Sequence, residues 1–142
     1  EHGSLGMGVC EISVDRSTGT IKVHRFWIAL DAGVVIQPDN VKAQMEGGII
    51  MGISSVLKEQ ITLVDGQVQQ RNYDDYQLLR MQEVPDSIET VIISATEHPE
   101  GVGETATPMV AGAIANAFLR LTGKRLRHLP FTPERVLAVL NS

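Results

Sequence analysis

The sequence predicts a mixed α/β fold of the α+β class, with strands and helices interleaved in one compact unit. Three stretches alternate apolar and polar residues, as half-buried strands do, and two longer segments repeat apolar residues at helical spacing. The chain has 142 residues, of which 43% are hydrophobic, so it is long enough to bury a core. No repeat, low-complexity tract or linker interrupts it. We therefore expect a single domain over residues 1–142.

The first two strands are expected to form a β-hairpin. The runs "GVCEISVD" and "TIKVHRFWIALDAG" flank a turn-rich connection, "RSTG". Side chains alternate across a strand, so Cys10, Ile12 and Val14 share one face, which we expect to face the core. Cys10 is the only cysteine, which excludes an internal disulfide. We interpret it as a small buried hydrophobe rather than a nucleophile or a metal ligand.

A long helix is predicted over residues 39–57, with Asp39 as its cap after Pro38. Its core-facing positions recur at helical spacing and comprise Val41, Met45, Gly48, Ile49, Gly52, Ile53 and Val56.

Two more helices are predicted nearer the C-terminal end. Residues 108–122 form the first of these, with Thr107 as its cap and Gly123 at its end. Its apolar stripe comprises Val110, Ile114, Ala117, Phe118 and Leu121. The second is signalled by "FTPERVLAVL", with Thr132 as cap and Pro133 at the first helical position.

Strands are also expected between the long helix and the second one. The runs "EQITLV" and "QVQQRNY" flank Asp65-Gly66, a strong hairpin signal, and "IETVIISAT" follows the turn-forming stretch "EVPDS". Whether these strands pair parallel or antiparallel stays open at this point.

Composition excludes several classes of function. The net charge is −5 and the isoelectric point about 5.3, so nucleic-acid binding is not expected. The best candidate for a membrane span, "GGIIMGISSVL", is too short and is interrupted by glycine. The chain lacks an initiating methionine and a signal pattern, so we interpret it as a piece of a longer chain, with periplasm and cytoplasm both open.

The long helix carries an unusual number of glycines. Gly47, Gly48 and Gly52 follow Gln44 within about two turns, and each glycine in a helix interior costs about 1 kcal/mol relative to alanine. Close approach of another helix or of a bound cofactor would offset this cost, and both explanations remain open. Gln44 would offer a ligand both donors and acceptors.

The stretch "HPEGVGETATPM" places a single glutamate, Glu104, between a glycine pair and a helix start. Gly101 and Gly103 permit unusual backbone angles and leave their amides accessible, so the loop suits an anionic group. Glu104 would serve either as a general base or as a carboxylate that satisfies the free amides of the helix start.

Other chemistries find little support in the sequence. The four histidines are scattered without metal-ligand spacing, so we expect no protein-ligated metal. The motifs of serine hydrolases, P-loop proteins and dinucleotide-binding folds are missing.

Three stretches, in this order, resemble one known family. They are "ALDAGVVIQPDNVKAQMEGGIIMGISSVLKEQI", "DGQVQQRNYDDYQLLRMQEVP" and "EGVGETATPMVAGAIANAFLRLTGKRLRHLP". Together they resemble the C-terminal part of the molybdopterin-binding large subunit of the xanthine oxidase and aldehyde oxidase family. The resemblance is greatest to the branch that includes the beta subunit of isoquinoline 1-oxidoreductase.

The resemblance implies roles for particular residues. In that family the glutamate of the Gly-x-Gly-Glu motif is the catalytic base, which corresponds to Glu104. The glutamine of the Gln-x-Glu-Gly-Gly motif lies against the molybdopterin, which corresponds to Gln44, with Gly47 and Gly48 beside it and Gly103 in the glycine loop. The metal is held by the pterin dithiolene and needs no protein ligand.

The implied function is that of part of a molybdenum hydroxylase, which oxidises an aldehyde or an aromatic N-heterocycle with water as the oxygen source. The implied cofactor is molybdopterin, in a dinucleotide form, with iron–sulfur clusters only on a partner subunit. The partners would be the N-terminal remainder of the large subunit, an iron–sulfur small subunit and a small-molecule substrate. We expect the fragment alone to be inactive. The alternative is a non-catalytic domain that keeps the fold for structure or assembly.

Overall fold

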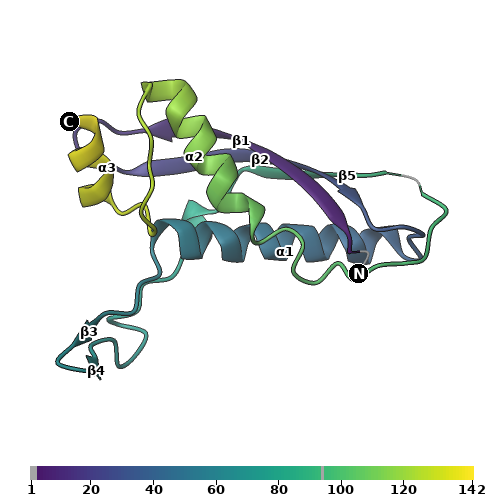
Figure 1. Cartoon of the computed structure of the whole chain (residues 1–142), viewed down its shortest axis with the longest axis horizontal. Coiled ribbons are helices and arrows are strands. Elements are labelled where there is room, and N and C mark those ends of the chain that lie inside the picture. Colours follow the sequence, from purple (N-terminus) through teal and green to yellow (C-terminus); the bar gives the residue numbers. More distant parts are fainter. Residues whose placement is uncertain (1–2, 94) are drawn as a thin grey trace.

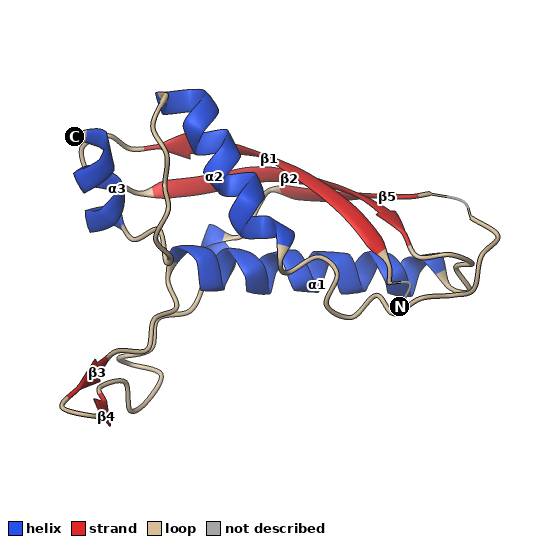
Figure 2. Cartoon of the chain, viewed as in Figure 1, coloured by secondary structure: helices blue, strands red, loops and turns tan. Residues whose placement is uncertain are grey.

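The computed structural model describes residues 3–93 and 95–142. Strands and helices alternate along the chain, as the sequence predicts (Figures 1 and 2). The elements in chain order are β1 (Leu5–Val14), β2 (Ile21–Asp31), α1 (Pro38–Leu57), β3 (Leu63–Val64), β4 (Gln67–Val68), η1 (Met81–Glu83), β5 (Ser87–Ile92), α2 (Met109–Thr122) and α3 (Pro133–Leu140).

The main sheet has three strands in the order β1-β2-β5. The predicted β1–β2 hairpin is confirmed and is antiparallel, with a register shift between Glu11 and Ile12. The pairing of β2 with β5, which the sequence left open, is parallel and begins at Arg25 opposite Ser87. Parallel pairing requires a long crossover, which α1 and the segment after it supply.

One face of this sheet is packed against α1 and α2 and forms the core (Figure 1). Every position of the long helix that was expected to be buried is buried. From β1, the predicted core face of Cys10, Ile12 and Val14 packs partly buried against the same cluster. Burial raises the pKa of the Cys10 thiol to about 11, which suits a hydrophobe and not a nucleophile.

The opposite face of the sheet is uncovered and apolar. Leu5, Met7 and Val9 of β1 are 63–80% exposed, and Val91 of β5 is 60% exposed. These side chains alternate with the core-facing ones, so they share one face. Between them Trp27 of β2 is partly covered by the guanidinium of Arg25, whose Cζ lies 5.1 Å from the ring centroid. A surface of this kind is typical of an interface.

Two predicted helix caps are wrong. Helix α1 begins at Pro38, so its cap is Gln37, whose side chain accepts a hydrogen bond from the Asp39 amide at 3.3 Å. Proline is suited to the first helical position, which moves the cap one residue earlier and places Asp39 in the first turn. Helix α2 begins at Met109, and Thr107 does not cap it.

The other boundaries of α2 and α3 follow the predictions. Gly123 ends α2 with φ of 74°, and Thr132 caps α3 by accepting from the Arg135 amide. The prediction that Leu121 belongs to the buried stripe of α2 is wrong, because this residue lies in the last turn and is 52% exposed.

The later strands are shorter than predicted. Asp65 and Gly66 do form a tight turn with both φ angles positive, but each flanking strand has only two residues. This hairpin projects from the body, and within the described residues no helix or second sheet packs on it (Figure 1). Strand β5 ends at Ile92, and Ser94, which the prediction included, lies outside the described residues.

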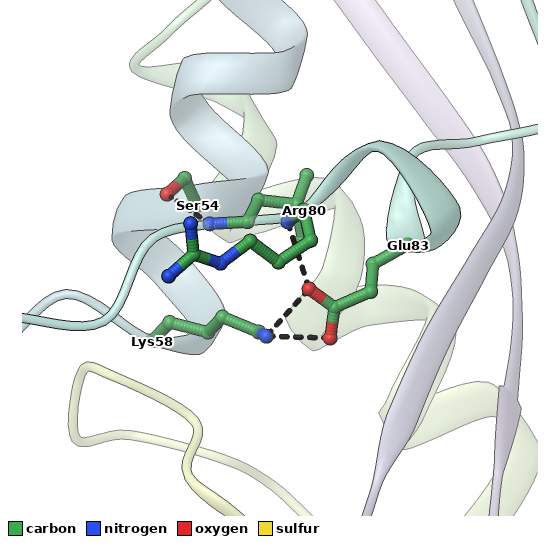
Figure 3. Close-up of polar contacts among 5 residues, drawn as sticks. Ser54, Lys58, Arg80 and Glu83 are labelled. Carbon is green, nitrogen blue, oxygen red and sulfur yellow. Dashed lines mark hydrogen bonds and ion pairs between the residues drawn. The ribbon is translucent and has the colours of Figure 1, made fainter. Parts of the chain in front are cut away.

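The segment before β5 is fastened to the end of α1. Buried Ser54 accepts a hydrogen bond from the Leu79 amide at 3.0 Å, and Lys58 contacts both carboxylate oxygens of Glu83 at 2.5 and 2.6 Å (Figure 3). Glu83 also accepts from the Arg80 amide at 2.8 Å. The hydrogen bond from Lys58, followed by that from Arg80, holds the pKa of the Glu83 carboxyl below its ordinary value.

Among the helices of the described residues, none combines the length and hydropathy of a membrane span.

Candidate functional site

The loop that carries Gly101 and Gly103 begins at a crossing, where residues 97–100 lie against the connection between β2 and α1. The Val34 amide donates to the Glu97 carbonyl at 3.0 Å, and the Glu100 amide donates to the Ala32 carbonyl at 2.9 Å. Between these bonds, a Cβ on Gly33 would collide with the His98 carbonyl oxygen, and the φ of Gly33 is 66°. Only glycine suits this crossing.

The same loop then packs on α1 through two of the helix glycines. A Cβ on Gly48 would stand 3.1 Å from the Ala106 Cβ, and one on Gly52 would stand 2.6 Å from the Val110 side chain. Thr107, instead of capping α2, donates its hydroxyl to the Gly48 carbonyl at 3.2 Å. Close helix packing, one of the two explanations left open, therefore accounts for Gly48 and Gly52.

Gly47 differs from its neighbours because no atom lies within 4 Å of where its Cβ would stand. It faces a pocket of about 520 Å³ between α1 and the loop before α2. The lining residues are Gln44, Gly47, Gly48, Met51, Gly103, Glu104, Thr107 and Pro108. All five predicted site residues thus line one concave surface, which is within the usual size of a small-molecule site.

Glu104 is exposed in this pocket. Within the described part of the chain, its carboxylate has no hydrogen-bond or ion-pair partner, although its carbonyl accepts from the Thr107 amide at 3.3 Å. The interpretation as a carboxylate that caps the helix is wrong, because α2 starts five residues later with Pro108 as its N-cap. The carboxylate is therefore available to a ligand.

The backbone of the loop corrects one expectation. Neither Gly101 nor Gly103 has a positive φ, so neither is needed for an unusual backbone conformation. Gly103 matters instead for what it leaves open: a Cβ there would stand 3.9 Å from the Gln44 amide nitrogen. A side chain at residue 103 would begin to fill the space between the loop and α1.

The pocket fits an organic cofactor with polar edges. Gly47 offers bare helix surface for a flat group, and the Gln44 amide offers both a donor and an acceptor. No lysine or arginine is among the lining residues, so a phosphate bound here would need its cation from elsewhere. Over residues 3–93 and 95–142, no cluster of His, Cys, Asp and Glu is arranged to hold a metal ion.

Fold and pocket together define an α+β domain with a concave site between α1 and the loop before α2. Residues 2–85 match the family described as the molybdopterin cofactor-binding domain. The chain belongs to this family, and the predicted kinship with the large subunits of the xanthine oxidase family is confirmed. Gln44, Gly47 and Gly48 lie inside the matched residues, and Gly103 and Glu104 lie beyond them.

Individual relatives match most of the chain. It is 45% identical to the beta subunit of isoquinoline 1-oxidoreductase from Brevundimonas diminuta over 88% of the chain and 16% of that protein. It is 31% identical to the molybdenum-binding subunit of aldehyde oxidoreductase from Escherichia coli over 89% of the chain and 18% of that protein. The chain therefore spans less than a fifth of these relatives.

A solved structure supports the same conclusion about the fold. The aldehyde oxidoreductase from Desulfovibrio gigas superposes with a TM-score of 0.87 and 26% identity, covering 98% of the chain and 16% of that protein. The mixed α+β unit is thus part of a larger architecture in a relative.

Sequence reasoning missed three residues of the pocket wall: Met51, Thr107 and Pro108. Met51 could have been found, since it stands four residues after Gly47 and so on the same helix face. The sequence indicated Thr107 as a cap, and only the position of the loop against α1 assigns it to the pocket.

Proposed function

We propose that this chain forms part of the large subunit of a molybdenum hydroxylase and supplies the general base, Glu104. The substrate class is an aldehyde or an aromatic N-heterocycle, with water as the oxygen source. One observation carries the proposal: a carboxylate without a partner among the described residues lies in the same pocket as Gln44 and bare helix glycine. Of the eight lining residues, Glu104 alone is charged.

The cofactor-binding roles follow from the lining. Gln44 would hydrogen-bond the polar edge of molybdopterin through its amide, and Gly47 would let the cofactor approach the α1 backbone. Gly48 would border the same space, with its own face packed on Ala106 and Thr107. Gly103 would keep the adjoining loop clear of the same space. When bound, the molybdenum cofactor would accept two electrons from the substrate. We propose the dinucleotide form, whose phosphates would be neutralised outside this pocket.

Glu104 would remove a proton from the oxygen nucleophile derived from water. A carboxylate can do this when it is ionised and within hydrogen-bond reach of the proton. The Glu104 carboxylate accepts no hydrogen bond from the described part of the chain, so both of its oxygens are available. The loop around it is fastened on both sides, at Glu100 and at Thr107, so its aim is restricted.

We further propose that the rest of the large subunit completes the site and covers the apolar sheet face. Leu5, Met7, Val9 and Val91 are exposed there, and covering them would contribute about 25 cal/mol for each Å² of apolar surface buried. An iron–sulfur small subunit would take the electrons. The chain alone would then be inactive, because only one wall of the pocket belongs to it.

The test is a Glu104→Gln substitution in the complete subunit, which keeps size and polarity but removes the base. We expect turnover of aldehydes or N-heterocycles to fall by about 10²–10⁴-fold, the usual contribution of a general base, with the molybdenum content unchanged. Asp65→Asn is the matched control, since Asp65 is an exposed carboxylate in the turn between β3 and β4 that does not line the pocket. Equal turnover in the two variants would contradict the assignment of Glu104.

A further inference from the structure

A pair of hydroxyl groups joins the start of β1 to the loop that carries Glu104. The Ser4 hydroxyl donates to the Gly101 carbonyl at 2.8 Å, and the Ser4 and Thr105 hydroxyl oxygens lie 2.5 Å apart. Ser4 and Thr105 are 101 residues apart in sequence, and both are half-buried. Thr105 directly follows Glu104.

The distances favour one direction for these bonds. Each hydroxyl has one hydrogen to donate, and Ser4 uses its hydrogen on the Gly101 carbonyl. Thr105 then donates to the Ser4 oxygen, since the alternative bond from the Thr105 hydroxyl to the Gly101 carbonyl is longer, at 3.4 Å. Together the bonds form a relay from Thr105 through Ser4 to Gly101, which closes the loop on itself around Glu104.

The methyl group of Thr105 adds a packing contact to the relay. A Cβ on Gly6 would stand 3.5 Å from the Thr105 Cγ2, so β1 approaches this methyl closely. On the other side of Glu104, buried Ala106 and the Thr107 hydroxyl fix the loop to Gly48 of α1. Glu104 therefore stands between two anchors, one on β1 and one on α1.

We propose that the Ser4–Thr105 hydroxyl relay, defined by Ser4, Thr105 and the Gly101 carbonyl, positions the Glu104 carboxylate in the pocket. Ser4 and Thr105 act as positioning residues, since neither is among the residues that line the pocket. The inference rests on the proposed role of Glu104. Without the relay the loop keeps its anchors at Glu100 and on α1 but loses its anchor on β1, so the carboxylate samples more orientations.

The first measurement is amide hydrogen exchange in the complete subunit at Glu100 and Thr107, whose amides donate to the Ala32 and Glu104 carbonyls on either side of the relay. This measurement does not depend on catalysis. Thr105→Val removes the hydroxyl and keeps both branches of the side chain, and we expect exchange there to rise by about 3- to 10-fold, as expected for one or two lost hydrogen bonds. Thr105→Ser keeps the hydroxyl and loses only the methyl contact with β1, so it should restore most of the native protection. Thr122→Val is the matched control, since its hydroxyl bonds the Phe118 carbonyl at 2.7 Å near the far end of α2. Unchanged exchange in Thr105→Val would overturn the relay.

The second measurement is catalytic. We expect Thr105→Val and Ser4→Ala to lower kcat by about 10- to 100-fold, the range for a misplaced catalytic group, with KM and molybdenum content unchanged and with rescue by Thr105→Ser. A rise in KM alone, or a matching loss in Thr122→Val, would overturn the positioning role.

Double variants separate this inference from the proposed function. If the relay acts through Glu104, Glu104→Gln combined with Thr105→Val should be no slower in single turnover than Glu104→Gln alone. Multiplied effects would overturn the inference. Full turnover in Glu104→Gln would instead refute the base, and normal turnover in Thr105→Val beside a slow Glu104→Gln would refute the relay alone.

Discussion

Gly47 offers a substitution whose effects on stability and on cofactor binding should have opposite signs. It stands in the interior of α1, and a Cβ at this position would meet no atom within 4 Å. Gly47→Ala therefore costs no packing and gains the helix propensity of alanine, about 1 kcal/mol. In a chain of this size, that gain should raise the unfolding midpoint by about 4 °C.

The same methyl group would project into the pocket that we assign to molybdopterin. An extra methyl in a filled site usually costs about 1–3 kcal/mol, so we expect cofactor affinity to fall by about 5- to 150-fold. Thermal unfolding of the chain and molybdenum content of the complete subunit measure the two effects.

Gly112→Ala provides the control for Gly47→Ala. Gly112 is an exposed glycine of α2 that likewise has no atom within 4 Å of its Cβ position, and it does not line the pocket. The Gly112→Ala variant should gain a similar amount of stability and should keep the native molybdenum content. The reasoning is refuted if Gly47→Ala lowers the unfolding midpoint, or if both variants retain the same molybdenum content.

Two further predictions concern stability. Gly52→Ala should destabilise the chain by about 1–3 kcal/mol in chemical denaturation, since its Cβ would stand 2.6 Å from the Val110 side chain, and native stability would contradict the packing. The lowered pKa of Glu83 means that the ionised carboxylate stabilises the folded chain. This stabilisation is complete when the pH is above the ordinary pKa of 4.5, and it is lost as the pH falls through the lowered pKa. The free energy of unfolding of Glu83→Gln should thus be lower than that of the native chain by up to about 1 kcal/mol at pH 7. The two free energies should converge in acid, and an equal difference at both pH values would contradict this.

Local patterns predicted the elements well where the signal lay within a single segment. The apolar period of α1 predicted each of its expected core positions, and the pairing of Thr132 with Pro133 predicted the start of α3. Caps failed where proline shifted the boundary, at Gln37 and again at Pro108. A cap depends on one backbone angle, which an apolar period does not specify.

Long-range features could not be predicted in the same way. The parallel pairing of β2 with β5 joins segments about 60 residues apart, and no local pattern selects it. The relay between Ser4 and Thr105 joins two ordinary hydroxyl residues that carry no motif. The site residues came from a resemblance to a family, whereas their convergence on one pocket required the fold.

The geometry of α1 explains why packing and cofactor contact need not compete. Successive residues of a helix are turned by about 100°, so Gly48 and Gly52 share one face while Gln44, Gly47 and Met51 share the adjacent one. The absence of side chains on the first face brings the start of α2 close to α1, and the loop before α2 then lies beside the second face. The pocket is therefore a consequence of the helix packing. A substitution at Gly52 should disturb both the helix packing and the pocket, whereas one at Gly47 should disturb the pocket and leave the packing intact.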